Sequence, residues 1–292
     1  MSRATADRGS LSRRIAELSA IPSTGSMPDD AWDVVDELIR GLESGSLRAA
    51  ERDGNGVWKA VPWVKQGILL GFRIAQVIDM TAYVTEGAPA RFFFFDKQTF
   101  PPRGFDLTDG VRIVPGGSAI RRGAYVAPGV VCMPPMYINV GAYVGPNTMV
   151  DSHALVGSCA QIGSRVHLSA AAQIGGVLEP VNAAPVIIED EVMVGGNCGV
   201  YEGTVVRERA VLAAGVVLTR GTPVYDLVNE TVYRGTADRA LEIPAGAVVV
   251  PGARRVKGEW AGEQALSLQT PVIVKYRDEQ TDLATTLESW LR

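Results

Sequence analysis

Apolar residues recur at every sixth position along two stretches in the middle of the chain. The first stretch contains Ile120, Val126, Cys132, Ile138, Val144, Val150, Val156, Ile162, Leu168 and Ile174. After a break, the spacing returns at Ile188, Val194, Val200, Val206, Leu212, Leu218 and Val224. Four residues after each of these anchors the side chain is usually small or β-branched, as at Ala124, Ala142, Thr148, Ala160, Val192 and Thr204. A period of six matches neither an α-helix nor a plain alternating strand.

This spacing is the hexapeptide signature of a parallel β-helix. Each hexad would form one short flat side and a turn, with the anchor pointing inward and the small residue beside it. Three sides make a coil, so the hexads fill roughly five to six coils, and three equal sides favour the left-handed form. Gly, Asn or Asp often follows the anchor directly, and we expect these residues to supply a positive-φ turn. They are Asn139, Gly145, Asp151, Gly157, Gly163, Gly175 and Gly195.

The hexads divide the chain into three predicted regions. Residues 1–110 carry no hexads and form a mainly helical N-terminal domain, residues 111–251 form the β-helix, and residues 252–292 form a small C-terminal segment. Apolar periodicity and turn residues predict helices at Ser10–Ala20, Pro28–Leu42, Pro62–Phe72 and Thr281–Leu291, a hairpin turning at Asp53–Gly56, and a strand at Pro271–Tyr276. The repeat is interrupted at Gly175–Val186 and at Thr222–Glu242, and loops on a rigid scaffold often carry function.

Composition narrows the class of protein. The chain has 292 residues, 47% of them hydrophobic, and a net charge of −4. The sequence has no Lys/Arg-rich run, no apolar stretch long enough to span a bilayer, and no apolar signal core in residues 1–14. We therefore expect neither nucleic acid nor a membrane as a partner. The three cysteines, Cys132, Cys159 and Cys198, all fall inside the repeat and predict buried thiols in a reducing cytoplasm.

Several strings of the sequence resemble the tetrahydrodipicolinate N-succinyltransferase family of hexapeptide-repeat acyltransferases. The resemblance covers roughly residues 30–280. The strings are LRAAERDGNGVWKAVPWVKQGILLGFRI at Leu47–Ile74, GAYV at Gly141–Val144, TMVD at Thr148–Asp151, VGSCAQIG at Val156–Gly163, VHLS at Val166–Ser169, IGGVLEP at Ile174–Pro180 and IIED at Ile187–Asp190.

The resemblance implies a homotrimer in which succinyl-CoA lies along a groove between adjacent subunits. It implies succinyl transfer to the amine of tetrahydrodipicolinate in its open 2-amino-6-oxopimelate form, a step of lysine and diaminopimelate biosynthesis. The chain departs from the family pattern at Ser152-His153, at Ala170-Ala171 and at Gly195–Tyr201. The alternatives are a CoA-dependent N-acetyltransferase, a relative acting on a related amino-dicarboxylate, and a non-enzymatic β-helix scaffold. Succinyl-CoA is expected as a co-substrate, with no metal or prosthetic group.

Amine attack on a thioester needs a base, because the amine is mostly protonated at neutral pH. Asp151 and Glu202 are the candidate catalytic residues. From spacing alone each carboxylate could equally be a turn residue. The resemblance implies that Asp151 binds and deprotonates the acceptor amine, and that Glu202 is the second acid of the site. His153 and His167 define a runner-up mechanism with a histidine base, as in related O-acetyltransferases.

Substrate carboxylates and CoA phosphates call for cationic partners. A guanidinium can hold a carboxylate through two hydrogen bonds, and the resemblance places such an arginine at Arg112. Arg73 is a second candidate for the acceptor. For the CoA side we expect contributions from Lys257 and Lys275, alongside Arg254 and Arg255. The loop that begins at Gly175 and Gly176 is expected to cover the acyl-donor groove and to become ordered when CoA binds.

Overall fold

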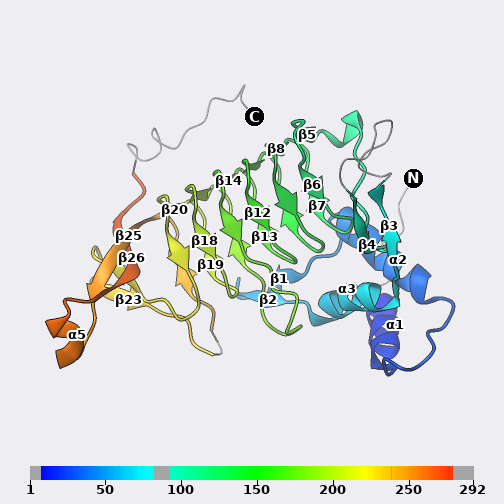
Figure 1. Ribbon diagram of the computed structural model, residues 1–292, viewed down its shortest axis with the longest axis horizontal. Helices are drawn as coiled ribbons and strands as arrows, with labels where there is room; N and C mark the ends of the chain where they lie inside the picture. The colour runs from blue at the N-terminus through cyan, green and yellow to red at the C-terminus, as the bar shows by residue number, and fades with distance from the viewer. Residues whose placement is uncertain (1–7, 82–92, 238, 279–292) are drawn as a thin grey trace.

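The computed structural model describes residues 8–81, 93–237 and 239–278. The molecule is a long prism of short parallel strands, with a helical body at one end and an extended arm at the other (Figure 1). The predicted closing helix at Thr281–Leu291 lies outside the described residues. The left-handed parallel β-helix predicted from the hexads is confirmed, and its strands form three sheets that run along the prism.

Each sheet is named here after one of its strands. The β10 sheet contains β7 Tyr125–Val126, β10 Tyr143–Val144, β13 Gln161–Ile162, β16 Ile187–Ile188, β19 Val205–Val206 and β24 Glu242–Ile243. The β11 sheet contains β5 Arg112–Ile113, β8 Val131–Cys132, β11 Met149–Val150, β14 His167–Leu168, β17 Met193–Val194, β20 Val211–Leu212 and the start of β25 Ala247–Arg255. The β12 sheet contains β6 Ala119–Ile120, β9 Tyr137–Ile138, β12 Leu155–Val156, β15 Gln173–Ile174, β18 Gly199–Val200 and β21 Val217–Leu218.

The interior of the prism is filled by the hexad anchors. Every anchor from Ile120 to Val224 is buried in one continuous apolar cluster. The small residues four positions later are mostly buried beside them, and the two buried threonines among them, Thr148 and Thr204, have partners. Thr148 Oγ1 donates to Gly163 O (2.9 Å), and Thr204 Oγ1 donates to Tyr201 O (2.7 Å). Buried hydroxyls without partners would be costly, so these two bonds let threonine replace alanine or valine.

The positive-φ position of the turns is not where the sequence predicted it. The left-handed residue stands three positions after the anchor, as at Asn147, His153, Arg165 and Asn197, and not one position after it. Residues of many types occupy this position because its backbone N–H donates to a carbonyl one coil below. For example, His153 N donates to Pro135 O and Ala171 N donates to Ser152 O. These bonds offset the strain of a left-handed side chain.

Glycine directly after the anchor has a different cause. A Cβ atom at Gly157 would lie 2.2 Å from Gly176 N, and one at Gly145 would lie 2.6 Å from the carbonyl carbon of Gly163. The coils therefore approach too closely at this position for a side chain. Asn139 and Asp151 occur there as well, and their side chains accept from the next backbone N–H.

Three helices that pack against one another form the body at the N-terminal end. They are α1 Arg8–Ala20, α2 Ala31–Glu43 and α3 Pro62–Ile74, close to the predicted ranges. Their apolar faces meet in a second core, which continues into the prism through Val140 and Cys159. Hairpin β3 Val77–Asp79 and β4 Phe95–Lys97 extends from this body, and a short 3-10 helix, η1 Leu107–Asp109, precedes the first coil.

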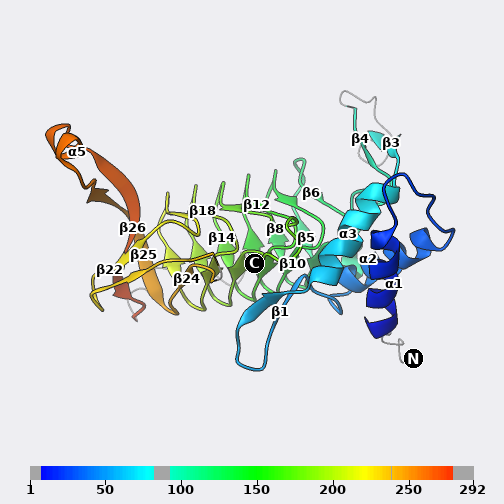
Figure 2. The ribbon, with the colours of Figure 1, turned by 90° about the horizontal axis from the view of Figure 1, so that it is seen from below.

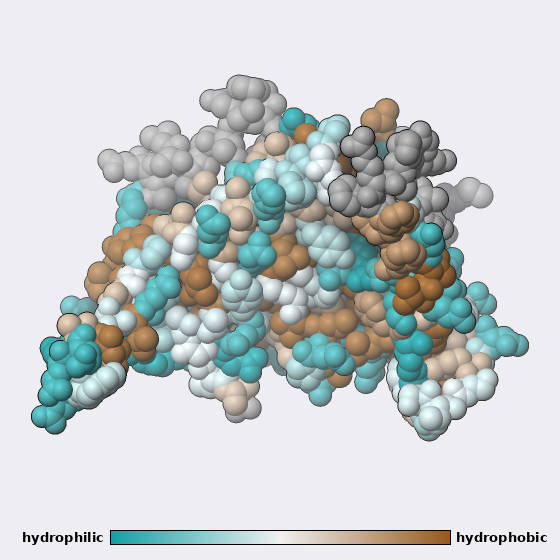
Figure 3. All heavy atoms as spheres, viewed as in Figure 1, coloured by the Kyte–Doolittle hydropathy of each residue, from teal (hydrophilic) through white to brown (hydrophobic). Residues whose placement is uncertain are grey.

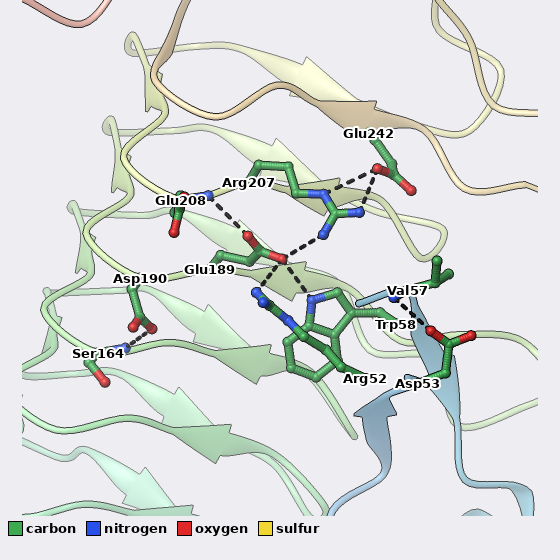
Figure 4. A network of polar contacts seen from close by, with 10 residues as sticks. All are labelled: Arg52, Asp53, Val57, Trp58, Ser164, Glu189, Asp190, Arg207, Glu208 and Glu242. Carbon is green, nitrogen blue, oxygen red and sulfur yellow. Dashed lines mark hydrogen bonds and ion pairs between the residues drawn. The ribbon is translucent and has the colours of Figure 1, made fainter. Parts of the chain in front are cut away.

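The predicted hairpin at Asp53–Gly56 is also present. Its strands, β1 Ala50–Arg52 and β2 Trp58–Ala60, lie on the β10 sheet, where Ala50 packs with Ile187 and Val205. A buried carboxylate fastens them there: Glu189 accepts from Trp58 Nε1 (2.8 Å) and pairs with Arg52 (2.7 Å) and Arg207 (2.9 Å) (Figure 4).

The C-terminal arm is a long hairpin that leaves the far end of the prism (Figure 2). Strand β25 begins inside the last coil, crosses the predicted boundary at residue 251 and pairs with β26 Ser267–Tyr276, which is longer than the predicted strand. Helix α5 Glu259–Glu263 lies at the tip. Strands β22 Val224–Asp226 and β23 Thr231–Tyr233 pack beside the base of the hairpin.

All three cysteines are free and buried, as predicted. Burial raises the pKa of the Cys132 and Cys159 thiols to about 12. None of the helices in the described ranges is long and apolar enough to cross a membrane.

Candidate active site

The prism has three edges, and the two candidate acids lie on different ones. The Asp151 edge joins the β11 sheet to the β12 sheet through the turns 133–136, 151–154, 169–172, 195–198 and 213–216. The Glu202 edge joins the β12 sheet to the β10 sheet through residues 121–124, 139–142, 157–160, 175–186, 201–204 and 219–241. Both interruptions of the repeat therefore project from the Glu202 edge, one coil to either side of Glu202.

Asp151 begins a tight turn directly after β11. Its backbone N–H donates to Leu168 O (2.9 Å), and its carboxylate accepts from Ser152 N (2.7 Å). The hydrogen bond to Ser152 fixes the orientation of the half-buried carboxylate at the edge. The next turn along this edge consists of small residues, Ser169, Ala170 and Ala171. A rigid carboxylate beside such a turn can meet an amine that approaches from outside the prism.

Glu202 occupies an unusual backbone position. It has φ +55° and is followed by Gly203 at φ +73°, so two successive residues of this turn are left-handed. In the other described hexads, a non-glycine residue with positive φ stands three places after the anchor, whereas Glu202 stands two places after Val200. Its carboxylate accepts from Arg220 N in the next coil (3.0 Å). Strained backbone of this kind often accompanies functional sites.

A cavity of about 560 Å³ opens beside Glu202. Its wall combines three segments that are far apart in the sequence: the end of hairpin β1–β2, the 175–186 loop and the 219–241 excursion. The side chains of Lys59, Arg220 and Arg239 bring positive charge to this wall. A cavity with one carboxylate and three cationic residues suits a ligand that carries both an amine and carboxylates.

The remaining predicted residues are spread over the molecule. Arg112 is exposed on β5. This strand lies in the same sheet as β11, the strand that precedes Asp151, and is separated from it by β8 alone. Two strand spacings amount to roughly 10 Å, which the long Arg112 side chain can partly cover. Gly175 and Gly176 lie on the Glu202 edge, one coil below Glu202, and Gly175 leaves room for the Tyr201 ring.

Arg73 lies in the helical body. Its guanidinium donates to Leu18 O (3.0 Å) and Ser19 O (3.5 Å), so it satisfies carbonyls at the end of α1. This contact gives Arg73 a structural role, and its predicted contact with the acceptor stays a prediction.

Lys257 and Lys275 lie at opposite ends of the C-terminal hairpin. Lys275 is opposite Val248 at the base and pairs with Asp278 (3.3 Å), whereas Lys257 follows Arg255 near the tip. The separation along the strands is roughly 26 Å, so the two lysines cannot hold the same phosphate. Their roles in CoA binding stay predictions, for different parts of the ligand.

Both histidines lie near Asp151. His153 is the left-handed residue of the same turn, and His167 projects from β14, opposite Met149. A histidine base therefore stays an alternative to Asp151, and substitution of each histidine tests it.

Three features of the site escaped the sequence analysis. They are the cationic residues Arg220 and Arg239, the hairpin contact through Glu189, and Lys65, whose side chain is completely buried. Of these, only Lys65 could have been recognised in the sequence, because this lysine falls within the apolar pattern of a predicted helix, between Val64 and Ile68. The others depend on which distant segments meet at one edge.

The comparisons with known proteins agree with the predicted resemblance. Residues 14–74 match the family model for the tetrahydrodipicolinate N-succinyltransferase N-terminal region, and residues 185–220 match the hexapeptide repeat of succinyl-transferase.

Curated relatives match nearly the whole chain. The protein of Polynucleobacter asymbioticus is 41% identical over 92% of this chain and 93% of its own length. Those of Bradyrhizobium diazoefficiens (42%; 94% and 99%) and Neisseria meningitidis serogroup B (43%; 89% and 89%) are similar. All three are named 2,3,4,5-tetrahydropyridine-2,6-dicarboxylate N-succinyltransferase. The chain therefore belongs to the 2,3,4,5-tetrahydropyridine-2,6-dicarboxylate N-succinyltransferase family.

Proposed function

We propose that this protein transfers the succinyl group of succinyl-CoA to the amine of tetrahydrodipicolinate, in its open 2-amino-6-oxopimelate form. This is the succinylase step of diaminopimelate and lysine biosynthesis. The observation that carries the proposal is the identity of about two residues in five with N-succinyltransferases over some nine-tenths of both chains. The cationic wall beside Glu202 supports it, because donor and acceptor both carry carboxylates.

The chemistry needs one proton acceptor and no covalent enzyme intermediate. Asp151 takes a proton from the acceptor ammonium, and the freed nitrogen lone pair attacks the thioester carbonyl carbon. As the tetrahedral adduct collapses, its nitrogen gives up a second proton, the C–S bond breaks, and the leaving CoA sulfur takes up that proton. Asp151 then releases the first proton to solvent. An amide bond has then replaced the thioester. Glu202 orients the amine, and Arg112 holds a carboxylate of the acceptor.

The two acids reach one site only if two copies of the chain supply them. Asp151 and Glu202 lie on different edges of the prism and two coils apart. In a cyclic trimer, the Asp151 edge of one subunit can face the Glu202 edge of its neighbour, which produces three equivalent sites. Outward-facing Met149, Met193 and Val211 on the β11 sheet are half-buried and would support such packing. Figure 3 shows apolar patches along the face of the prism that it views. A single 31.1 kDa species in light scattering would contradict the trimer.

Steady-state kinetics test the reaction. With the acceptor held constant, CoA release is measured with succinyl-CoA and with acetyl-CoA. A value of kcat/KM for succinyl-CoA at least tenfold above that for acetyl-CoA is expected. The opposite preference would favour the N-acetyltransferase alternative, and no CoA release with either donor would favour the scaffold alternative.

A further inference from the structure

Lys65 is a buried cation that belongs to the helical body but bonds to the loop beside the cavity. Its side chain is 0% exposed, and it projects from α3. Nζ donates to Pro180 O (3.0 Å) and to Ala183 O (2.8 Å). Burial lowers the pKa of the Lys65 ammonium. Within the described ranges its hydrogen bonds go to carbonyl oxygens and not to a carboxylate, although a buried cation is costly without strong partners.

For its length, the 175–186 loop has fewer bonds to the neighbouring coils than the short turns have, so its contact with Lys65 helps to hold it in place. Most turns on the Glu202 edge are four residues long and bond to the coils above and below, whereas the segment 175–186 bulges away from the ladder. Ala183 N donates to Pro180 O, which closes a tight turn. Lys65 Nζ bonds to the carbonyls at both ends of this turn. One ammonium group therefore satisfies two loop carbonyls and fixes the turn against α3.

The fixed turn lies directly against the Glu202 turn. Asn182, Ala183 and Ala184 line the cavity together with Glu202. Ala184 O lies only 2.6 Å from the place that a Cβ atom on Gly203 would take. A shift of the loop would therefore change both the width of the cavity and the space available to the strained Glu202–Gly203 backbone.

We propose that Lys65 is a positioning residue for the acyl-transfer site: by clamping the Pro180–Ala183 turn to α3, it sets the wall of the Glu202 cavity. The N-terminal helical body thus acts on the site through one ammonium group. The kinetic part of this proposal rests on the proposed function, whereas the structural part does not.

The test compares Lys65→Met with Lys97→Met. Methionine keeps an unbranched side chain but cannot donate. Lys97 on β4 is the control, because its Nζ also donates to a backbone carbonyl, Ala75 O (2.9 Å), and neither residue lines the cavity. Hydrogen exchange of the 175–186 amides is measured for both variants, together with melting temperature and the KM and kcat for each substrate.

In Lys65→Met, we expect exchange at Val177 and Ala183 to rise about tenfold or more and kcat/KM for the acceptor to fall at least about tenfold, because small misplacements near reacting groups are costly. Lys97→Met should show neither change, even at an equal loss of melting temperature. Lys65→Gln keeps one amide donor and should recover part of both properties. It also carries the comparison if Lys65→Met does not fold.

Unchanged exchange in the loop of Lys65→Met or Lys65→Gln would overturn the clamp. Faster exchange with normal acceptor kinetics would overturn the positioning role. Failure of the wild type to use succinyl-CoA would refute the proposed function instead, and the exchange comparison would still decide the clamp.

Discussion

The Asp151 edge and the Glu202 edge are built from the same hexads but carry different structures. Along the Asp151 edge, the turns from 133–136 to 213–216 are all four residues long, and those from 169–172 onward consist largely of Ser, Ala and Gly. Along the Glu202 edge, two turns are expanded into the 175–186 loop and the 219–241 excursion, and hairpin β1–β2 and α3 pack nearby. The Asp151 edge is thus left uncovered by loops, whereas the expanded turns of the Glu202 edge form the walls of the cavity. We infer that the two edges make unequal halves of one site.

The largest expected effect is on the open edge. Asp151→Asn keeps an oxygen that can accept from Ser152 N, so the turn should survive. It removes the base, and kcat should fall by ~10² to 10⁴. His153→Ala and His167→Ala should cost far less. Turnover with succinyl-CoA in excess and melting temperatures of the three variants check this. Near-normal turnover in Asp151→Asn, with collapse in a folded histidine variant, would favour the histidine base.

A mixing experiment tests whether the edges of different subunits meet. Asp151→Asn and Glu202→Gln are co-expressed with different tags, and doubly tagged trimers are isolated. Each mixed trimer should contain one site in three with both acids intact, so the isolated doubly tagged trimers should have about a third of wild-type activity. Activity no higher than that of the separate variants would place both acids within one chain's site or show that they do not share one.

The packing of the coils differs between positions within a turn. Directly after an anchor it is tight on both edges: a Cβ at Gly157 would lie 2.2 Å from backbone, and one at Gly195 would lie 2.6 Å from it. Two places after an anchor, at Gly196, the nearest atom, Ala170 O, lies 3.3 Å away. Gly157→Ala should therefore lower the free energy of unfolding by ~1 to 3 kcal/mol, and Gly196→Ala by much less. Denaturant titrations of both variants check the difference. Equal losses would show that the coils are equally tight at the two positions.

The smallest effect is expected from thiol reagents. Cys159 lies on the Glu202 edge and Cys198 on the Asp151 edge, and burial raises the pKa of both thiols. At pH 8, a thiol with a pKa of about 12 is ionised in only about one molecule in 10⁴, so native protein should not react on the timescale of minutes. Unfolded protein should react at all three cysteines. Selective labelling of Cys198 in the native protein would show that the Asp151 edge opens.

The sequence was sufficient to predict the prism because one requirement repeats: an inward apolar side chain at every sixth residue. The positive-φ prediction was wrong because two constraints were merged. Close stacking selects glycine after the anchor, as at Gly157, whereas the left-handed position is stabilised by a hydrogen bond to the coil below and accepts His153 or Arg165.

Only part of the candidate site could be predicted from the sequence, and the roles of its residues stay predictions. Asp151 stands in the string TMVD, whereas Glu202 directly follows Gly195–Tyr201, where the chain departs from the family pattern. The cavity depends on contacts between residues more than a hundred positions apart, such as Lys65 and Pro180. Local patterns do not encode which loop a distant helix will touch.

Because each regular coil has eighteen residues, the number of coils between Asp151 and Glu202 sets the distance between them along the prism. Met149 lies opposite His167, and His167 lies within the same ladder as Met193. Inserting one additional coil between β12 and β18 would leave the stacking rules satisfied, yet it would move Glu202 by one strand spacing, about 4.8 Å, relative to Asp151. Such a chain should fold and be catalytically silent. The number of coils between the two acids is therefore under tighter constraint than the identity of the residues that fill them.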